Sequence, residues 1–524
     1  RGSGADDETG GEIYELHDVL SRDEEDPATK AASSLSDLGE GISSGIERMF
    51  GGNVNQYMAA RFVTIDYDTP LILPPNLRDW VPTGHLAHFI LDAVEEMDLR
   101  QVRVNERGTG SEQYPPRMLL ALLLYCYATG VFSSRRIEQA TFDSVPVRMI
   151  SGDTHPDHDT ICTFRRENPG LLAETFVRVL ELAQALKFLQ VGQITVAVDG
   201  TKVLANASKH AAVSYEHAGK TIQQLELEVK ELLTKAEQAD SRPLEEGLTI
   251  PKEVQRRQER KAKLATARAE IEARAQARAA AEMAEYQAKL AERAAQKESG
   301  RKPRGPDPKI PSPQPNPSDQ YNFTDPESRI MKAGNGQHFE QCYNAQAAVE
   351  VDSRLIVGER VSPAPNDKQE LVPNLAAIAR PVASVAAVLI DSGFYSEAAV
   401  QAVEQTGLGQ PTGTLVYAAM EKKEHHRTVS DLEQKPEPEV PGPEATPSQR
   451  MKYRLRTPEG RAKYKLRQQT VEPVFGIIKS VLGFRQFLLR GLAKVGLEWR
   501  WVCLAYNLKR LHILGAGLKI GTGS

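Results

Sequence analysis

The sequence lacks the features of disulfide-stapled, zinc-binding or membrane-spanning proteins. Its four cysteines, Cys126, Cys162, Cys342 and Cys503, are scattered and form no CxxC pair, so neither a disulfide framework nor a zinc cluster is encoded. The longest apolar stretch, 118–132, is shorter than the ~20 residues that span a bilayer and predicts a buried helix instead. The acidic N-terminus has neither the basic nor the apolar region of a secretory signal. These absences predict a cytosolic protein that makes no membrane contact.

A large net charge is absent too, since the formal charge is -5, and this argues against a nucleic-acid-binding protein. The charge is unevenly distributed, however. Residues 1–50 contain 13 acidic and 4 basic residues, whereas residues 450–512 contain 15 basic and three acidic ones. A basic C-terminal segment can bind the phosphate backbone of DNA, although such a segment is also typical of an ordinary solvated surface.

A chain of 524 residues is long enough for two or three domains. Residues 1–52 are acidic and rich in Ser and Gly, which predicts a disordered tail. Residues 70–190 predict an all-α N-terminal domain. Pro, Gly and Asp residues mark the ends of its helices, which are predicted at 83–97, 115–130, 133–142, 158–167 and 170–187.

The helix over 158–167 is expected to begin behind Asp157 or Asp159 and to present Arg165 and Arg166 on its surface. This layout fits a helix-turn-helix, in which the second helix enters the major groove of DNA. A plain helical bundle with surface arginines is the favoured interpretation of the same pattern, and the helix-turn-helix stays open beside it.

A different composition follows the helical domain. Residues 193–207 predict a buried strand with Asp199-Gly200 at its middle or end. Residues 218–300 are dominated by Ala, Glu, Arg, Lys and Gln, which predicts an inserted antiparallel coiled-coil hairpin with a break near 241–251. A Pro-rich linker occupies 301–317.

Alternating strands and helices then resume. Strands are predicted at 341–352, 354–363, 384–396 and 413–420, and helices at 368–380, 397–407, 458–482 and 496–514. Three leading strands followed by strand-helix alternation predict a mixed sheet flanked by helices, which is the order of a ribonuclease-H-like domain. The fold class is therefore α/β, with the catalytic domain formed by 191–217 and 318–515 and interrupted by the coiled coil.

Three acidic residues lie where this fold can bring them together. Asp199 and Asp391 belong to apolar strand runs, and a carboxylate in such a run is costly unless it is paired or binds a metal ion. Glu472 lies in a basic helix, with Lys479 two turns further on. Taken singly, each has a simpler explanation: a turn, a helix cap or a surface ion pair. Together they predict a site for two Mg²⁺ (or Mn²⁺) ions, the arrangement that cleaves phosphodiesters.

Several longer motifs then resemble one family, the bacterial insertion-sequence DDE transposases, over roughly 70–515. The matching segments are YPPRMLLALLLYCYATGVFSSRRIE (114–138), HPDHDTICTFRR (155–166), VAVDGTKVLANAS (196–208), TDPESRIMK (324–332), YNAQAAVEV (343–351), NDKQELVP (366–373), LIDSGFYSEAAV (389–400) and RQQTVEPVFGIIK (467–479). Their order is the one expected for an N-terminal helical transposase domain followed by a ribonuclease-H-like DDE domain.

The resemblance implies a catalytic triad of Asp199, Asp391 and Glu472, with Lys479 as the basic residue seven positions after the glutamate. Such transposases also carry an Arg four residues before the glutamate, but that position is Gln468 here. Arg467, one residue out of register, is the stand-in, and Tyr464 is displaced in the same way. DNA contacts are expected from the basic residues Arg165, Arg166, Arg467, Lys479 and Arg485.

Other residues allow two interpretations. Asn344 and Gln346 are candidates for supporting the site or contacting DNA, but structural roles at a strand end explain them equally well. His155 and His158 form an HxxH with no third ligand nearby, which favours a structural or DNA-backbone role. Trp80, Trp499 and Trp501 could stack on flipped bases, but the last two, in an amphipathic terminal helix, are assigned to the core.

The resemblance predicts an endonuclease and DNA strand transferase, active in transposition and DNA recombination in the bacterial cytosol at the nucleoid. Its partners are expected to be double-stranded DNA, both element ends and target, and a second copy of the chain in a homodimer on DNA. One alternative is an inactive DNA-binding relic, against which the intact acids argue. The other is a coiled-coil scaffold in which 218–298 is the working part.

Overall fold

The structure is a computed structural model. It describes residues 76–100, 102, 113–190, 192–239, 249–298, 307–333, 338–379, 384–406, 410–419, 440–442 and 445–515. All of them belong to one unit, Leu73–Ser524. The predicted acidic tail 1–52 and the first part of the predicted linker, 301–306, lie outside the described residues. Within the described ranges, no helix combines the length and the apolar character that crossing a membrane requires.

The N-terminal part is helical. A 3-10 turn precedes six helices: η2 (Leu77–Trp80), α2 (Leu86–Glu95), α3 (Pro116–Ala128), α4 (Ser134–Asp143), α5 (Val145–Ile150), α6 (His158–Glu167) and α7 (Pro169–Ala185). The five predicted helices are confirmed, with ends that differ by no more than three residues. Proline in the first turn begins α3 and α7, and the Asp157 side chain caps α6 by accepting from the Thr160 amide.

A six-stranded mixed sheet forms the second part. Its strands are β1 (Gln193–Leu204), β4 (Arg329–Ala333), β5 (His338–Glu350), β6 (Ile356–Ser362), β7 (Ser384–Ile390) and β8 (Leu415–Ala418). β5 lies antiparallel to β1, β4 and β6, and β4 and β6 pair with different halves of it. β7 and β8 continue the sheet in parallel on the other side of β1. The mixed α/β arrangement predicted from the sequence is confirmed, and this strand order is consistent with a ribonuclease-H-like domain.

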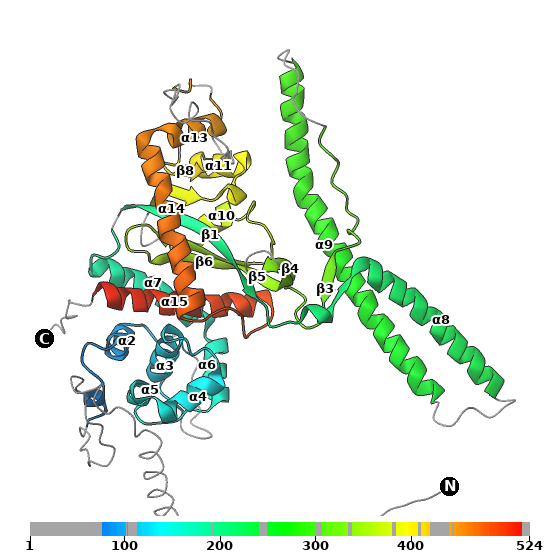
Figure 1. Cartoon of the computed structure of the whole chain (residues 1–524), viewed down its shortest axis with the longest axis horizontal. Helices are drawn as coiled ribbons and strands as arrows, with labels where there is room; N and C mark the ends of the chain where they lie inside the picture. The colour runs from blue at the N-terminus through cyan, green and yellow to red at the C-terminus, as the bar shows by residue number, and fades with distance from the viewer. Residues whose placement is uncertain are drawn as a thin grey trace, which may run out of the picture. The chain divides into compact units, whose positions relative to one another are not determined.

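Helices accompany the sheet. They are α10 (Leu371–Ala376), the 3-10 turn η4 (Ser392–Phe394), α11 (Glu397–Glu404), α13 (Pro447–Arg456), α14 (Pro458–Gly476), the π-helical turn η5 (Ile477–Val481) and α15 (Leu492–Leu514). α14 contacts β1 and β5, and Figure 1 shows it running across the strands. Pro473 lies inside α14 without ending it, and the irregular turn η5 follows four residues later.

One hydrophobic core runs through both parts. α15 contacts β6 as well as α2, α3 and α7. Its Trp499 and Trp501 are buried, and the Trp501 ring lies 6.0 Å from the ring of Tyr127 on α3. The prediction that both tryptophans belong to the core is therefore confirmed. The predicted helical domain and the predicted catalytic domain are packed onto each other through this helix rather than separated by a linker.

Two long helices interrupt the sheet between β1 and β4. They are α8 (Tyr215–Ala239) and α9 (Ile250–Glu298), and they pack against each other through Ala218, Leu225, Leu264 and Ala267. The 3-10 turn η3 (Lys209–Ala211) leads into the short pair β2 (Ala212–Ser214) and β3 (Gln320–Asn322), which joins the two ends of the insertion. The insertion lies where the sequence predicted it, and a coiled-coil geometry of the two helices stays a prediction.

Candidate active site

The sheet register places the two candidate aspartates side by side. On β1, Val198 pairs with Ile390, the last residue of the parallel strand β7. Asp199 directly follows Val198, and Asp391 directly follows Ile390. The two aspartates therefore lie at neighbouring positions of the sheet. Asp199 stays within β1 and faces Ala347 of β5, whereas Asp391 lies beyond the end of its strand.

The third acid comes from α14, and a single arginine links all three. In Arg467, one terminal nitrogen (Nη1) lies 3.2 Å from Oδ2 of Asp199. The other (Nη2) lies 3.9 Å from Oδ1 of Asp391 and 3.5 Å from Oε1 of Glu472. The structure thus brings the three sequence-predicted acids around one guanidinium group, although they come from three different elements.

Exposure differs sharply within this cluster. The side chain of Arg467 is 11% exposed and that of Asp199 22%, whereas Asp391 and Glu472 are 51% and 55% exposed. The site therefore has a buried floor and two solvent-facing carboxylates that a bound molecule could reach.

Burial makes the charge of Asp199 costly. Burial, together with the nearby carboxylates of Asp367 and Asp391, raises the pKa of the carboxyl to about 6. The Gly200 amide, which donates to Oδ1 at 2.8 Å, and the Arg467 guanidinium lower the pKa and partly offset this effect. Even with Arg467 beside it, Asp199 therefore holds its proton more tightly than an ordinary aspartate does.

Metal binding can be judged from the donor set. Three carboxylates provide oxygen ligands only, which is the type that Mg²⁺ and Mn²⁺ take. Among the described residues, no group of three or more Asp, Glu, His or Cys side chains is arranged to hold a metal ion. In this cluster the guanidinium of Arg467 lies among the oxygens. The carboxylates fit divalent ions by donor type, and Arg467 is the cation that they contact in this structure.

Lys479, the basic residue seven positions after Glu472, lies apart from the three acids. Lys479, on η5, is half-buried, and its ammonium group donates to the Lys202 carbonyl at 2.7 Å. Burial lowers the pKa of Lys479. Lys202 lies three residues beyond Asp199 on β1, so Lys479 contacts the same strand as the acid cluster without contacting an acid. Gln468 is exposed while Arg467 is buried. The residue of α14 that faces inward is therefore Arg467, the stand-in for the arginine of the family motif.

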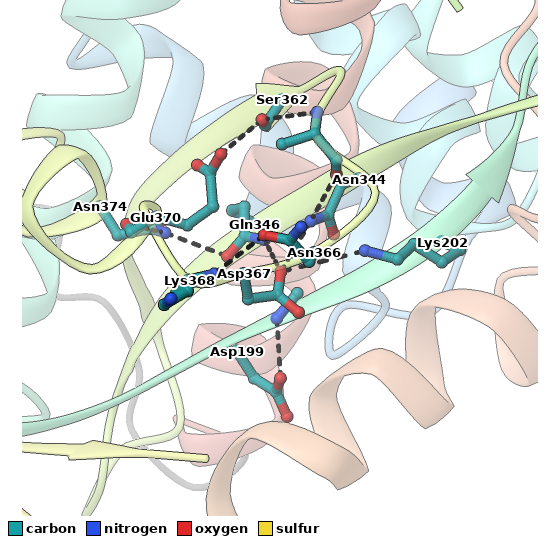
Figure 2. Close-up of polar contacts among 12 residues, drawn as sticks. Asp199, Lys202, Asn344, Gln346, Ser362, Asn366, Asp367, Lys368, Glu370 and Asn374 are labelled. Atoms are coloured by element: carbon teal, nitrogen blue, oxygen red, sulfur yellow. Dashed lines mark hydrogen bonds and ion pairs between the residues drawn. The ribbon is translucent and has the colours of Figure 1, made fainter. Parts of the chain in front are cut away.

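A second polar cluster lies on the other face of β1, because successive strand residues point to opposite sides. Figure 2 shows it with Asp199 pointing away. Oδ1 of Asp367 accepts from Asn344 at 2.6 Å and from Gln346 at 2.7 Å, and the Lys202 ammonium lies 3.9 Å away. Asn344 and Gln346 are completely buried, which supports their structural interpretation and argues against DNA contact.

This second cluster was missed by sequence reasoning. In the sequence the NDKQE segment, which supplies Asp367 and Glu370, stands out only as a family motif, and no pattern indicates that its acids point inward. Glu370 pairs with Arg360 and accepts from the Ser362 hydroxyl at 2.6 Å. The cluster therefore ties the loop after β6 to β5 and β1.

The arginines predicted to contact DNA fall into two groups. Arg166 and Arg485 are exposed. Arg165 is buried, and its guanidinium donates to the Tyr127 hydroxyl and to the Phe132 carbonyl, both at 3.0 Å. The prediction that Arg165 lies on the helix surface is wrong, because this side of α6 faces α3 rather than solvent.

The HxxH histidines do not converge. His158 Nδ1 lies 2.8 Å from the Glu138 carboxylate. His155 stacks on Phe142 with ring centroids 3.8 Å apart, and its Nδ1 lies 3.0 Å from the Thr141 hydroxyl. Each histidine has its own partner on α4, as the structural interpretation expected.

Comparison with known families adds to this geometry. Residues 441–512 match the family model described as "Transposase DDE domain", and residues 75–167 match the one described as "Transposase domain (DUF772)". The first match contains Arg467 and Glu472, and the second contains the helices up to α6. No curated protein and no solved structure matches the chain. Both families indicate a transposase function. The chain is therefore similar, over these two segments, to a transposase domain and to a transposase DDE domain, which is consistent with an insertion-sequence DDE transposase.

Proposed function

We propose that the chain is a metal-dependent DNA transposase that cleaves the ends of a mobile element and joins them to target DNA. The observation that carries this proposal is the meeting of Asp199, Asp391 and Glu472 around one cation. Acids from two strands and a helix, far apart in the sequence, have no structural need to share a single site.

The chemistry follows from the residues. Two bound Mg²⁺ or Mn²⁺ ions would activate the attacking oxygen and stabilise the charge on the leaving oxygen. Asp199, Asp391 and Glu472 would hold these ions. Asp199 supplies a fixed, buried ligand on the rigid strand β1. The half-exposed Asp391 and Glu472 lie where the scissile phosphate of a DNA strand can approach.

Binding of double-stranded DNA is part of the proposal. α13 and α14 present exposed basic side chains, namely Arg450, Lys452, Arg456, Arg461 and Lys465. Basic residues on the helix that also carries Glu472 would neutralise backbone phosphates close to the acids. Exposed Arg166 and Arg485 would add further contacts. We propose that two copies of the chain bring two element ends together, in the bacterial cytosol at the nucleoid.

The test is cleavage of duplexes copied from the DNA that flanks the gene. Asp199→Asn, Asp391→Asn and Glu472→Gln should each reduce Mg²⁺-dependent nicking by about 100-fold or more, while binding to the same duplex is retained. Glu459→Gln, at the solvent-facing start of α14, is the matched control and should cleave normally. If a variant lacking all three acids still nicked element ends in Mg²⁺, the assignment would be wrong.

A further inference from the structure

Arg467 holds a position that the proposed metal ions also need. Its two terminal nitrogens contact oxygens of Asp199, Asp391 and Glu472 at 3.2, 3.9 and 3.5 Å. These are the oxygens that would bind the ions. Ions placed among them would lie in or directly beside the space now filled by the guanidinium.

The charges in the acid cluster also indicate that Arg467 and the metal ions compete for it. One guanidinium among three carboxylates leaves the cluster short of positive charge, so it attracts further cations. A divalent ion held by the same oxygens would lie within a few ångströms of the guanidinium, and like charges at that distance repel strongly in a partly buried site. The guanidinium and a full set of metal ions are therefore competing occupants of the acid cluster.

The cluster is also preassembled. Because Arg467 is nearly buried and reaches all three acids, it draws Glu472 of α14 toward Asp199 of β1 and Asp391 beyond β7. Three carboxylates this close would repel one another without a cation. Arg467 is thus placed both to assemble the acids and to delay their occupation.

We propose that Arg467 is a built-in competitor for the divalent metal ions, which keeps the three acids together before the ions bind and moves aside when they do. This inference rests on the proposed function for the identity of the ions. It predicts that the arginine lowers metal affinity, whereas a purely positioning arginine would raise it.

The test is the affinity of the full-length protein for Mn²⁺, measured from the free-ion signal in electron paramagnetic resonance. Arg467→Gln should bind Mn²⁺ about tenfold more tightly or better, because it removes a positive charge from among the ligands. Arg178→Gln, at an exposed arginine on α7 that has no part in the proposed site, is the charge-matched control and should stay within about twofold of wild type.

Two further variants distinguish a failure of the competitor role from a failure of the proposed function. Asp199→Asn should lose this Mn²⁺ binding, and so should Asp199→Asn combined with Arg467→Gln. If Asp199→Asn lost binding while Arg467→Gln bound equally or more weakly than wild type, the competitor role would be overturned and the metal site would stand. If Asp199→Asn bound Mn²⁺ like wild type, the proposed function itself would fail.

Unfolding measurements provide a second readout. In EDTA, Arg467→Gln should be less stable than wild type because the acids repel, and Mn²⁺ should stabilise it more than it stabilises wild type. If Arg467→Gln does not fold, Arg467→Met decides, because methionine keeps much of the buried aliphatic length of the arginine but carries no charge. Tighter Mn²⁺ binding by Arg467→Met supports the competitor role, and unchanged or weaker binding overturns it.

Discussion

Arg467 and Asp199 are separated by 268 positions in the chain, yet their side chains are 3.2 Å apart. The long insertion of α8 and α9 lies between them in sequence without disturbing this contact. Both residues sit on elements that pack directly onto each other, since α14 contacts β1. The ion pair therefore links the strand that carries one candidate acid to the helix that carries another.

Gly200 is a position where even a small substitution should lower the stability of the protein. A Cβ at this residue would lie 2.2 Å from Gln346 Nε2, 2.6 Å from Asn344 Oδ1 and 2.8 Å from Asp367 Oδ1. The side-chain amide nitrogens of Asn344 and Gln346 both donate to Asp367 Oδ1, so these three side chains cannot move aside singly. Gly200→Ala should lower the free energy of unfolding by about 1–3 kcal/mol in chemical denaturation.

Gly476, near the end of α14, is the matched control for Gly200. A Cβ there meets nothing within 4 Å outside its own helix. Gly476→Ala should leave stability unchanged or raise it by up to about 1 kcal/mol, because alanine favours the helix. Equal effects of the two substitutions would contradict the close packing of the polar cluster over β1.

Substitution of Arg165 should affect stability, whereas substitution of its neighbour Arg166 should affect DNA binding. Arg165→Ala leaves a cavity and removes the donor to the Tyr127 hydroxyl and the Phe132 carbonyl, so it should cost about 2–4 kcal/mol of unfolding free energy. Arg166→Ala, at an exposed position, should leave stability almost unchanged and weaken DNA binding. Denaturation and a DNA mobility-shift titration measure the two effects. Normal stability with selective loss of DNA affinity in Arg165→Ala would restore the surface interpretation.

The order of helices and strands was largely predictable because each element has a clear local pattern. The apolar run before Asp391 ends where β7 ends, and proline or aspartate marks the start of several helices. The two candidate aspartates are predictable for the same reason, as carboxylates in or after apolar strands, whereas Glu472 in its basic helix is indicated only by its order after them. β4 was missed because its five residues carry no distinct periodicity, and α13 was missed because it is mostly polar, with Met451 its buried residue.

Side-chain direction was less predictable. Adjacent arginines on α6 look alike in sequence, and only packing against α3 decides that Arg165 points inward. The same holds for Arg467 and Gln468. Counting back from Glu472 along the family motif selects Gln468, but the docking of α14 on the sheet turns Arg467 toward the acids. Such choices depend on tertiary contacts that no local pattern contains.

Glu359 gives the pH dependence of stability a specific source. It lies on β6, and its carboxylate accepts from Arg500 Nε on α15 at 2.5 Å. Burial raises the pKa of Glu359 to about 7, and Arg500 opposes the rise only in part. Because the folded protein then holds this proton more tightly than the unfolded chain, the contribution of Glu359 to stability is greatest below pH 4.5, the ordinary pKa of Glu. It should fall as the pH rises to about 7 and then stay level.

Glu359→Gln cannot ionise and should remove this fall, which is on the order of 3 kcal/mol in wild type. Asp199 adds a loss of the same sign up to about pH 6, since its pKa is also raised by burial. Asp199→Asn should therefore flatten only the lower part of the curve, and Glu359→Gln should flatten it up to pH 7. Urea denaturation at several pH values, with EDTA present, measures each curve. If Glu359→Gln lost stability with rising pH as steeply as wild type, the buried carboxyl of Glu359 would be ionised in the folded protein well below pH 7, and Arg500 would outweigh the cost of its burial.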